Sequence, residues 1–245
     1  MRRGMRVATA HNPAPLLSIE RLSVFYDQFR AVDGIDLSVA AGEIVSIIGA
    51  NGAGKSSLLK AIVGQADRIE GTIRFEGEDL AGRTTPEIVA KGIALVPEGR
   101  RLFPSLSVEE NLHLGWEVGR RKEIGLTEVF DFFPVLKERR GQKARELSGG
   151  QQQMVALGRA LLANPKLLLC DEISLGLAPL IVDSLYELVP RIKERGIGIV
   201  IVEQDISRSL AVADRFYCLL EGKVTLASRR GEASRDVVMK HYFGL

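Results

Sequence analysis

The sequence predicts an α/β protein whose core is a largely parallel sheet with helices on both faces. Three observations support this prediction. Short apolar runs alternate with stretches of helical periodicity over residues 167–221, a glycine-rich loop at 49–54 joins a strand pattern to a helix pattern, and the apolar run 167–170 ends in two carboxylates, Asp171 and Glu172. Alternating strands and helices favour parallel pairing because each helix returns the chain to the same end of the sheet.

The N-terminal part is rich in strands that are separated by turn signals at Asp33-Gly34 and Ala41-Gly42. Four apolar residues at helical spacing predict a helix over 55–63. The elements expected here are, in order, strands at 17–26, 35–39 and 44–49, the helix at 55–63, a strand at 71–75, a short helix opening at Thr85-Pro86-Glu87 and a buried strand at 93–96.

The middle of the chain, from 107 to 163, contains no strand pattern. Ser107 with Glu110, and Ser148 with Gln151, have the spacing of capping boxes, in which a Ser and an acidic or amide side chain satisfy the first free N–H groups of a helix. This stretch is therefore predicted to be a helical insert, with one helix at 126–133. The elements expected after it are a strand at 167–171, a helix at 180–195 that Pro190 would kink, a strand at 197–202, a helix at 206–213, strands at 216–221 and 223–227, and a last helix capped by Ser234.

Composition argues against several classes of function. The chain has 245 residues with 33 Lys and Arg against 31 Asp and Glu, a formal net charge of +2, and no block of like charges, so no nucleic-acid partner is expected. Two cysteines, Cys170 and Cys218, lie in apolar runs and are expected to be buried free thiols in a reducing compartment. Three histidines, His11, His113 and His241, are too scattered for a metal site or a catalytic triad.

No apolar run approaches the roughly 18 to 20 residues that a membrane-spanning helix needs. Residues 1–15 carry arginines without the apolar core of a signal peptide, so we expect a flexible N-terminal tail and a cytoplasmic location.

Residues 49–56, GANGAGKS, fit the pattern G-x-x-x-x-G-K-[ST] between a strand and a helix, as in P-loop proteins. Glycines let backbone N–H groups approach phosphate oxygens at the positive end of a helix dipole. Lys55 would contact the β- and γ-phosphates, and the Ser56 hydroxyl would bind Mg²⁺. The alternative is an ordinary glycine turn. The residues expected around a nucleotide are Gly49, Asn51, Gly52, Ala53, Gly54, Lys55, Ser56 and Ser57.

The run LLLCDE at 167–172 is an apolar strand ending in two carboxylates, which in P-loop proteins completes a magnesium–nucleotide site. Successive side chains of a strand point to opposite faces, so the two groups are expected to have different tasks. Asp171 would hold Mg²⁺, and Glu172 would orient and deprotonate the attacking water. By itself, the run would fit a buried strand with a solvated acidic end better, and the glycine loop upstream reverses this preference.

A second candidate anion site begins a helix at 147–153, LSGGQQQ. The Ser148 hydroxyl and the N–H groups of Gly149 and Gly150 could bind an anion, with Gln151 completing the cap. An ordinary capping box would have the same local geometry. One phosphate chain scarcely needs two such sites.

With these three motifs in this order, the sequence resembles the ATP-binding subunits of ABC transporters over nearly its whole length. The resemblance implies a P-loop NTPase fold of ABC type at 16–245, with an antiparallel β subdomain on the N-terminal side and a helical subdomain at about 99–163. It implies ATP and Mg²⁺ as ligands and a head-to-tail pair, homodimer or heterodimer, in which residues 148–151 of one subunit cover the nucleotide of the other. It also implies that Tyr26 stacks on adenine; the alternative is a core or rim aromatic.

Three further segments, 96–104 (VPEGRRLFP), 174–179 (SLGLAP) and 202–205 (VEQD), are similar to the ATPase subunit of branched-chain amino acid importers, the LivF type. Importers of urea and amides share such segments and are the alternative. The resemblance implies as partners a second ATPase subunit, transmembrane permeases and, indirectly, a solute-binding protein. It places the chain on the inner face of the cell membrane.

Four positions depart from the general ABC pattern. Glu98 replaces the usual glutamine near the metal, Gln204 replaces the switch histidine, Ala178 replaces an aspartate and Ile173 replaces a proline. Glu98 adds negative charge beside the metal, which would favour Mg²⁺ and repel phosphate. Gln204 can donate a hydrogen bond to a γ-phosphate but cannot carry a charge. A slow or non-hydrolysing regulatory subunit is therefore the alternative function.

The resemblance also suggests contacts with the membrane partner. Arg100 and Arg101 follow the position that couples to the permease in the family; a solvated turn is the alternative. Phe103, Leu112 and Trp116 are candidates for lining a groove that receives a permease helix, although core packing is the commoner fate of such residues.

Overall fold

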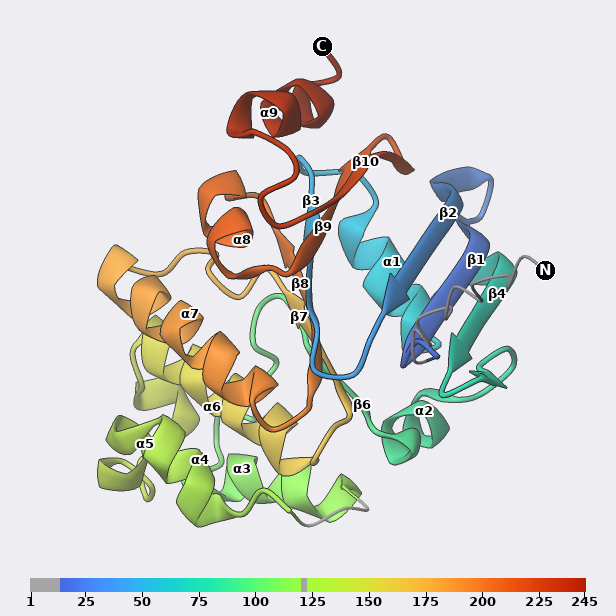
Figure 1. The fold of residues 1–245 in the computed structure, drawn as a ribbon. Coiled ribbons are helices and arrows are strands. Elements are labelled where there is room, and N and C mark those ends of the chain that lie inside the picture. Colours follow the sequence, from blue (N-terminus) through green and yellow to red (C-terminus); the bar gives the residue numbers. More distant parts are fainter. Residues whose placement is uncertain (1–13, 120–122) are drawn as a thin grey trace, which may run out of the picture.

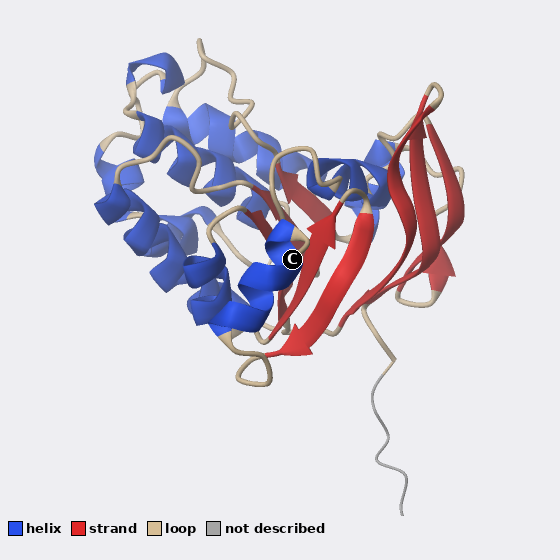
Figure 2. Ribbon diagram, turned by 90° about the horizontal axis from the view of Figure 1, so that it is seen from above, coloured by secondary structure: helices blue, strands red, loops and turns tan. Residues whose placement is uncertain are grey.

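A computed structural model describes residues 14–119 and 123–245 of the chain (Figure 1). The predicted N-terminal tail spans residues 1–15, and all of it except its last two residues lies outside the described residues. His11 lies outside them as well. The described residues form two sheets and a helical region. Figure 2 shows the smaller sheet on one side of the larger one and most helices on the other.

The larger sheet has the strand order β10-β9-β3-β8-β7-β6. All its neighbouring strands pair in parallel except the edge pair β9 and β10, which is antiparallel. This confirms the predicted α/β core. Its strands are β3 (Ile44–Ile48), β6 (Ile93–Val96), β7 (Leu167–Asp171), β8 (Gly198–Glu203), β9 (Arg215–Leu220) and β10 (Lys223–Arg229).

The central strands are buried on both faces, so neighbouring side chains enter two different cores. Leu168 and Cys170 of β7 pack with the helical region, whereas Leu167 and Leu169 pack with α1 and the smaller sheet. This period of two follows from the pleat of a strand. It also explains why these strands read as continuous apolar runs. Cys170 and Cys218 are buried free thiols, as predicted.

The smaller sheet has the order β2-β1-β4-β5 and is antiparallel throughout, as the resemblance implies. The predicted turn at Asp33-Gly34 is wrong, because β2 runs through it. Gly34 has φ 63° at an irregularity of the β1–β2 register, where its N–H donates to Ser23 Oγ at 3.0 Å. The chain turns instead at 27–28. The strands are β1 (Leu17–Tyr26), β2 (Phe29–Val39), β4 (Arg68–Phe75) and β5 (Glu78–Asp79).

The helical region lies between β6 and β7, at the lower left of Figure 1. Both predicted capping boxes are confirmed, at Ser107 and at Ser148. Gly115 allows α3 to approach α6, because a Cβ there would lie 1.9 Å from the Arg159 carbonyl oxygen. The region comprises α3 (Val108–Val118), α4 (Leu126–Phe132), α5 (Pro134–Glu138), a short 3₁₀ turn (Ala144–Glu146) and α6 (Gly149–Leu162).

The remaining helices cover the sheets. The helix α7 continues through Pro190, where a kink was predicted. Within the described ranges no helix combines the length and the apolarity required to cross a bilayer. These helices are α1 (Lys55–Ile62), α2 (Thr85–Lys91), α7 (Pro179–Lys193), α8 (Ile206–Val212) and α9 (Arg235–Phe243).

Candidate functional site

The glycine loop links the end of β3 to the start of α1 and is held tightly against its neighbours. Gly54, the N-cap of α1, has φ 98°, and a Cβ there would lie 2.4 Å from the Ala31 carbonyl oxygen. At Gly49 a Cβ would lie 2.5 Å from the Leu219 carbonyl oxygen. Only glycine satisfies these positions, so the loop is built to bring backbone N–H groups together at a helix N-terminus.

Lys55 projects its ammonium group back over this loop although its side chain is only 4% exposed. The Nζ atom donates to the carbonyl oxygens of Gly49 at 2.8 Å and Ala50 at 3.1 Å, and lies 3.3 Å from Glu172 Oε1. A buried ammonium needs such partners, because an unpaired buried charge is costly. The positive charge is thereby fixed at the mouth of the loop.

Ser56 and Asp171 meet where α1 begins and β7 ends. The Ser56 hydroxyl donates to Asp171 Oδ1 at 2.9 Å. Burial raises the pKa of Asp171, the Ser56 hydrogen bond opposes this shift, and the charges of Glu172 and Glu98 raise the pKa further. Nearby carboxylates that disfavour each other's charge make a site where a cation would be stabilised.

Glu172 directly follows β7, and its side chain lines the cavity in front of the glycine loop, whereas Asp171 lines a different one. The Glu172 backbone has φ 48°, a conformation that few side chains adopt readily. Besides the Lys55 contact, its carboxylate accepts a hydrogen bond from Gln204 Nε2 at 2.7 Å. Residues 172 and 204, which are far apart in sequence, thus meet at the ends of the neighbouring strands β7 and β8.

A cavity of about 530 Å³ opens in front of the loop and gathers most of the predicted site residues. Glu98, Glu172 and Gln204 share it with the loop. Its lining residues are Phe29, Ala31, Asn51, Gly52, Gly54, Lys55, Ser56, Ser57, Glu98, Glu172, Leu175 and Gln204. Gly49 and Ala53 are packed beneath it instead. Asp171 reaches an adjoining cavity of about 820 Å³ that also includes Ser56 and Glu98.

The aromatic ring at this cavity is Phe29, which the sequence analysis did not single out. Phe29 is 68% exposed and lines the cavity. Tyr26 does not line it: its ring packs partly buried against the core, and its hydroxyl has no hydrogen-bond partner. The sequence signal that could have identified Phe29 is its position directly after the Asp27-Gln28 turn. It also lies two residues before Ala31, whose carbonyl oxygen lies against Gly54.

The N-terminus of α6 does not face this cavity. Ser148 is exposed and caps its own helix, accepting from the Gln151 N–H at 3.4 Å. Gly149 lies against the Arg100 guanidinium, which donates to Gln152 Oε1 at 3.1 Å. The second candidate anion site is therefore separate from the first within one chain.

The candidate permease contacts divide into two groups. Arg101 and Phe103 line a shallow groove of about 520 Å³ on the helical region, and Phe103 is 53% exposed. The prediction for Leu112 is wrong, because this residue is completely buried in the core of the helical region. Trp116 packs partly buried against the same core. Arg100 is tied to α6 and does not line the groove.

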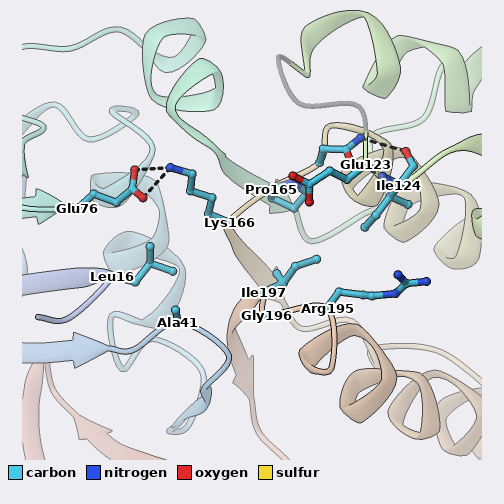
Figure 3. A pocket seen from close by; sticks show the side chains of 11 residues that line it. Leu16, Ala41, Glu76, Glu123, Ile124, Pro165, Lys166, Arg195, Gly196 and Ile197 are labelled. Atoms are coloured by element: carbon cyan, nitrogen blue, oxygen red, sulfur yellow. Dashed lines mark hydrogen bonds and ion pairs between the residues drawn. The ribbon is translucent and has the colours of Figure 1, made fainter. Parts of the chain in front are cut away.

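Another cavity lies at the opposite ends of the strands of the larger sheet, where β7 and β8 begin (Figure 3). Two pairs of its lining residues are joined by hydrogen bonds: the Lys166 ammonium donates to both carboxylate oxygens of Glu76 at 2.6 Å, and the Asn164 amide donates to the Ile124 carbonyl oxygen at 3.1 Å. None of the predicted site residues lies there. The residues that line the 530 Å³ cavity lie instead at the carboxyl ends of the strands, where α/β sheets bind ligands.

Comparisons with known proteins agree with this geometry. The family described as ABC transporter matches residues 32–174. The branched-chain amino acid transport ATP-binding protein BraG of Pseudomonas aeruginosa is 44% identical over 213 residues, covering 86% of this chain and 91% of BraG. The probable LivG of Methanocaldococcus jannaschii is 31% identical over 241 residues, covering 91% and 93%. A solved ATP-binding cassette of an ABC transporter, in its ADP conformation, has a TM-score of 0.80 at 30% identity, covering 95% of this chain and 100% of that one.

Proposed function

Because the chain belongs to the ABC transporter family of ATP-hydrolysing subunits, we propose that it powers a separate transmembrane permease for branched-chain amino acids. The similarity to BraG and LivG, both described as branched-chain amino acid transport ATP-binding proteins, supports this cargo. The lipopolysaccharide export relatives are less similar, at 28–29% identity. The working position of the chain is then the inner face of the membrane, bound to its permease.

The observation that carries the proposal is the convergence of Lys55, Glu172 and Gln204 on one cavity next to the glycine loop. The loop N–H groups and the Lys55 ammonium would bind the phosphates of ATP. Hydrogen bonds between charged partners are the strong ones in proteins, so these contacts would provide much of the affinity.

The residues beside the loop fit a magnesium ion. Ser56 and Asp171 offer a hydroxyl and a carboxylate at hydrogen-bond distance from each other, and Glu98 lies at the same cavities. The described part of the chain has no group of three or more His, Cys, Asp or Glu side chains that could hold a metal alone. Mg²⁺ suits such a site because it is commonly held by one or two carboxylates, waters and the substrate phosphates. When bound, it would neutralise charge on the phosphates.

Glu172 is the proposed general base. Its carboxylate faces the cavity and could take the proton of a water that attacks the γ-phosphate. Gln204 would orient this carboxylate through the 2.7 Å hydrogen bond that its amide donates, without adding a second positive charge beside it. These two groups act together at the adjacent ends of β7 and β8.

A second subunit completes the proposed site. Residues 148–151 at the start of α6 expose the Ser148 side chain and do not line the cavity of their own chain. A head-to-tail pair would place this end over the nucleotide of the other subunit. The partner would be a second copy or a related ATPase. The groove around Arg101 and Phe103 would receive the permease.

ATP hydrolysis by the purified chain and by a Glu172→Gln variant tests the proposal. If Glu172 is the base, the variant should bind ATP normally and turn over roughly 10² to 10⁴ times more slowly. Equal, slow rates for both proteins would instead identify a nucleotide-gated regulatory subunit. Stimulation of hydrolysis in the permease complex by leucine, isoleucine or valine, and not by urea or amides, would support the proposed cargo.

A further inference from the structure

A buried carboxylate, Glu203 at the end of β8, has no part in the proposed reaction. It is only 2% exposed. Its Oε2 accepts a hydrogen bond from the Ser174 hydroxyl at 2.9 Å, and its Oε1 accepts one from the Ser174 N–H at 3.3 Å. Both contacts join β8 to the segment that follows β7. Ser174, which donates both of these hydrogen bonds, lies two positions beyond Glu172.

Three consecutive residues, the last two of β8 and Gln204 directly after it, hold the segment 172–174 in three different ways. The Val202 carbonyl accepts from the Glu172 N–H at 3.0 Å, the Glu203 carboxylate holds both donors of Ser174, and the Gln204 amide donates to the Glu172 carboxylate. The strands β7 and β8 are direct neighbours in the sheet (Figure 1). The position of Glu172 is therefore fixed at its backbone, at its side chain and at the turn that follows it.

The turn needs such an anchor. Glu172 has φ 48°, in the left-handed region, and its carbonyl accepts from the Leu175 N–H at 3.1 Å to close the turn. A residue other than glycine in this region costs free energy and persists where its surroundings hold it. Ser174, the third residue of this turn, is the one that Glu203 grips. Releasing Ser174 would let the Glu172 backbone relax and move its carboxylate.

Keeping a carboxylate at this place is costly. Burial raises the pKa of Glu203, and the hydrogen bonds from its neighbours oppose the shift. The Tyr186 hydroxyl is buried beside it, and burial followed by the Glu203 charge raises the pKa of that hydroxyl as well. An apolar side chain would fill this position at lower cost, so packing alone does not account for a carboxylate here.

We propose that Glu203 is a positioning residue for ATP hydrolysis: through Ser174 it holds the turn that aims the Glu172 carboxylate. This inference rests on the proposed role of Glu172 as the general base. Glu203 touches neither nucleotide nor water in this scheme. It should therefore affect the rate of the chemical step and leave ATP binding intact.

Steady-state ATPase kinetics and nucleotide affinity of Glu203→Leu and Glu203→Gln test the proposal. The leucine variant should lower kcat roughly 10- to 100-fold, because small misplacements of a catalytic group are costly, and should leave the Kd for ATP unchanged. The glutamine variant should recover most of the rate, since its amide oxygen can accept from the Ser174 N–H and its amide N–H can donate to the Ser174 hydroxyl. A glutamine variant as slow as the leucine variant would contradict the positioning role.

Two further variants separate positioning from general stability. Tyr186→Phe removes the other polar group beside the carboxylate without touching residues 172–174, so it should change the Tm more than kcat. Ser174→Ala should lower kcat by itself and add little to Glu203→Leu in the double variant. Ser174 is only half-buried, so this variant tests the proposal even if Glu203→Leu fails to fold.

The Glu172→Gln variant, measured in the same assays, separates a failure of the positioning role of Glu203 from a failure of the proposed base role of Glu172. If it loses turnover while Glu203→Leu and Ser174→Ala remain at the wild-type rate, only the positioning role of Glu203 is overturned. If Glu172→Gln itself turns over at the wild-type rate, the proposed base is wrong, and the role of Glu203 falls with it.

Discussion

The chain has two helix N-termini suited to anions, and they differ in how complete they are. At the glycine loop, the Ser56 hydroxyl donates to the Asp171 carboxylate at 2.9 Å, and the Lys55 ammonium lies 3.3 Å from the Glu172 carboxylate. At the start of α6, the Ser148 hydroxyl is bonded to its own helix and is exposed. Both have the same local chemistry of glycine N–H groups and a hydroxyl. Only the first is surrounded by groups that could carry out a reaction.

This difference is informative because a buried charge needs neighbouring partners, whereas an exposed polar group can hydrogen-bond to water. The glycine-loop site keeps charges away from water and compensates them with neighbouring side chains, which makes a rigid half of a site. The α6 terminus leaves the Ser148 side chain exposed, and residues 148–151 include neither the proposed base nor a proposed metal ligand. A reaction that needs both halves must therefore bring in the α6 terminus of another subunit. The predictions below test this division.

Among the variants that compare the two helix ends, the largest effect is expected for Ser148→Ala. Loss of a donor aimed at transition-state charge typically slows turnover about 10² to 10³ times. The matched control is Ser107→Ala, which removes the other capping box of the same helical region. Each substitution should cost about 1 kcal/mol of stability through the lost cap. Only Ser148→Ala should reduce turnover, as measured by phosphate release; equal losses in both would show that the α6 terminus is simply a helix cap.

Mixing experiments sharpen this test. In a head-to-tail pair, one Lys55→Ala chain and one Ser148→Ala chain together retain one complete site. A mixture of the two purified variants should therefore be more active than either alone. A mixture that stays inactive would show that the partner in the working pair is a different subunit.

The next largest effect is expected for Lys55→Ala, which acts on the half that one chain supplies by itself. Hydrogen bonds to charged groups contribute about 1.5 to 3 kcal/mol, so the Kd for ATP should rise about 10- to 150-fold. Lys60→Ala is the control, since Lys60 lies exposed on the same helix and does not line the 530 Å³ cavity in front of the glycine loop. Equilibrium binding of ATP to the separate chain measures both. Unchanged affinity in Lys55→Ala would remove the phosphate-binding role of the loop.

The sequence predicted the residues of the glycine-loop half because their positions follow from local rules. A strand, a glycine loop and a helix place Lys55 and Ser56 at the carboxyl edge of the sheet, and parallel pairing brings Asp171 and Glu172 to the same edge. The false turn at Asp33-Gly34 shows the limit of such rules. A glycine with positive φ serves a turn and a bulge equally well, and only the pairing of β1 with β2 decides between them.

Contacts made between distant parts of the chain were hidden from sequence reasoning. Glu203 ends an apolar run, and its partner Ser174 lies 29 residues earlier, so nothing local distinguishes it from a solvated strand end. Leu112 and Phe103 looked equivalent in sequence, yet one is buried in the helical core and the other is exposed at a groove. Which face of a helix is buried depends on its neighbours in space.

The smallest predicted effect concerns the base of the nucleotide. An aromatic contact contributes about 0.5 to 1.5 kcal/mol, so Phe29→Leu should raise the Kd for ATP about 2- to 12-fold. Tyr26→Leu is the matched variant and tests the adenine-stacking role that the resemblance implies for Tyr26. Inorganic triphosphate has no base to stack, so its affinity should be the same for both variants and the wild type.

The pair of substitutions decides which ring belongs to the site. Phe29 lines the cavity and is 68% exposed, whereas Tyr26 is packed against the core. Loss of ATP affinity in Phe29→Leu alone would therefore extend the glycine-loop half of the site to the start of β2. Loss of ATP affinity in Tyr26→Leu alone, with triphosphate binding intact, would require the Tyr26 ring to leave the core when the nucleotide binds. The glycine-loop half of the site would then be less rigid than its buried contacts suggest.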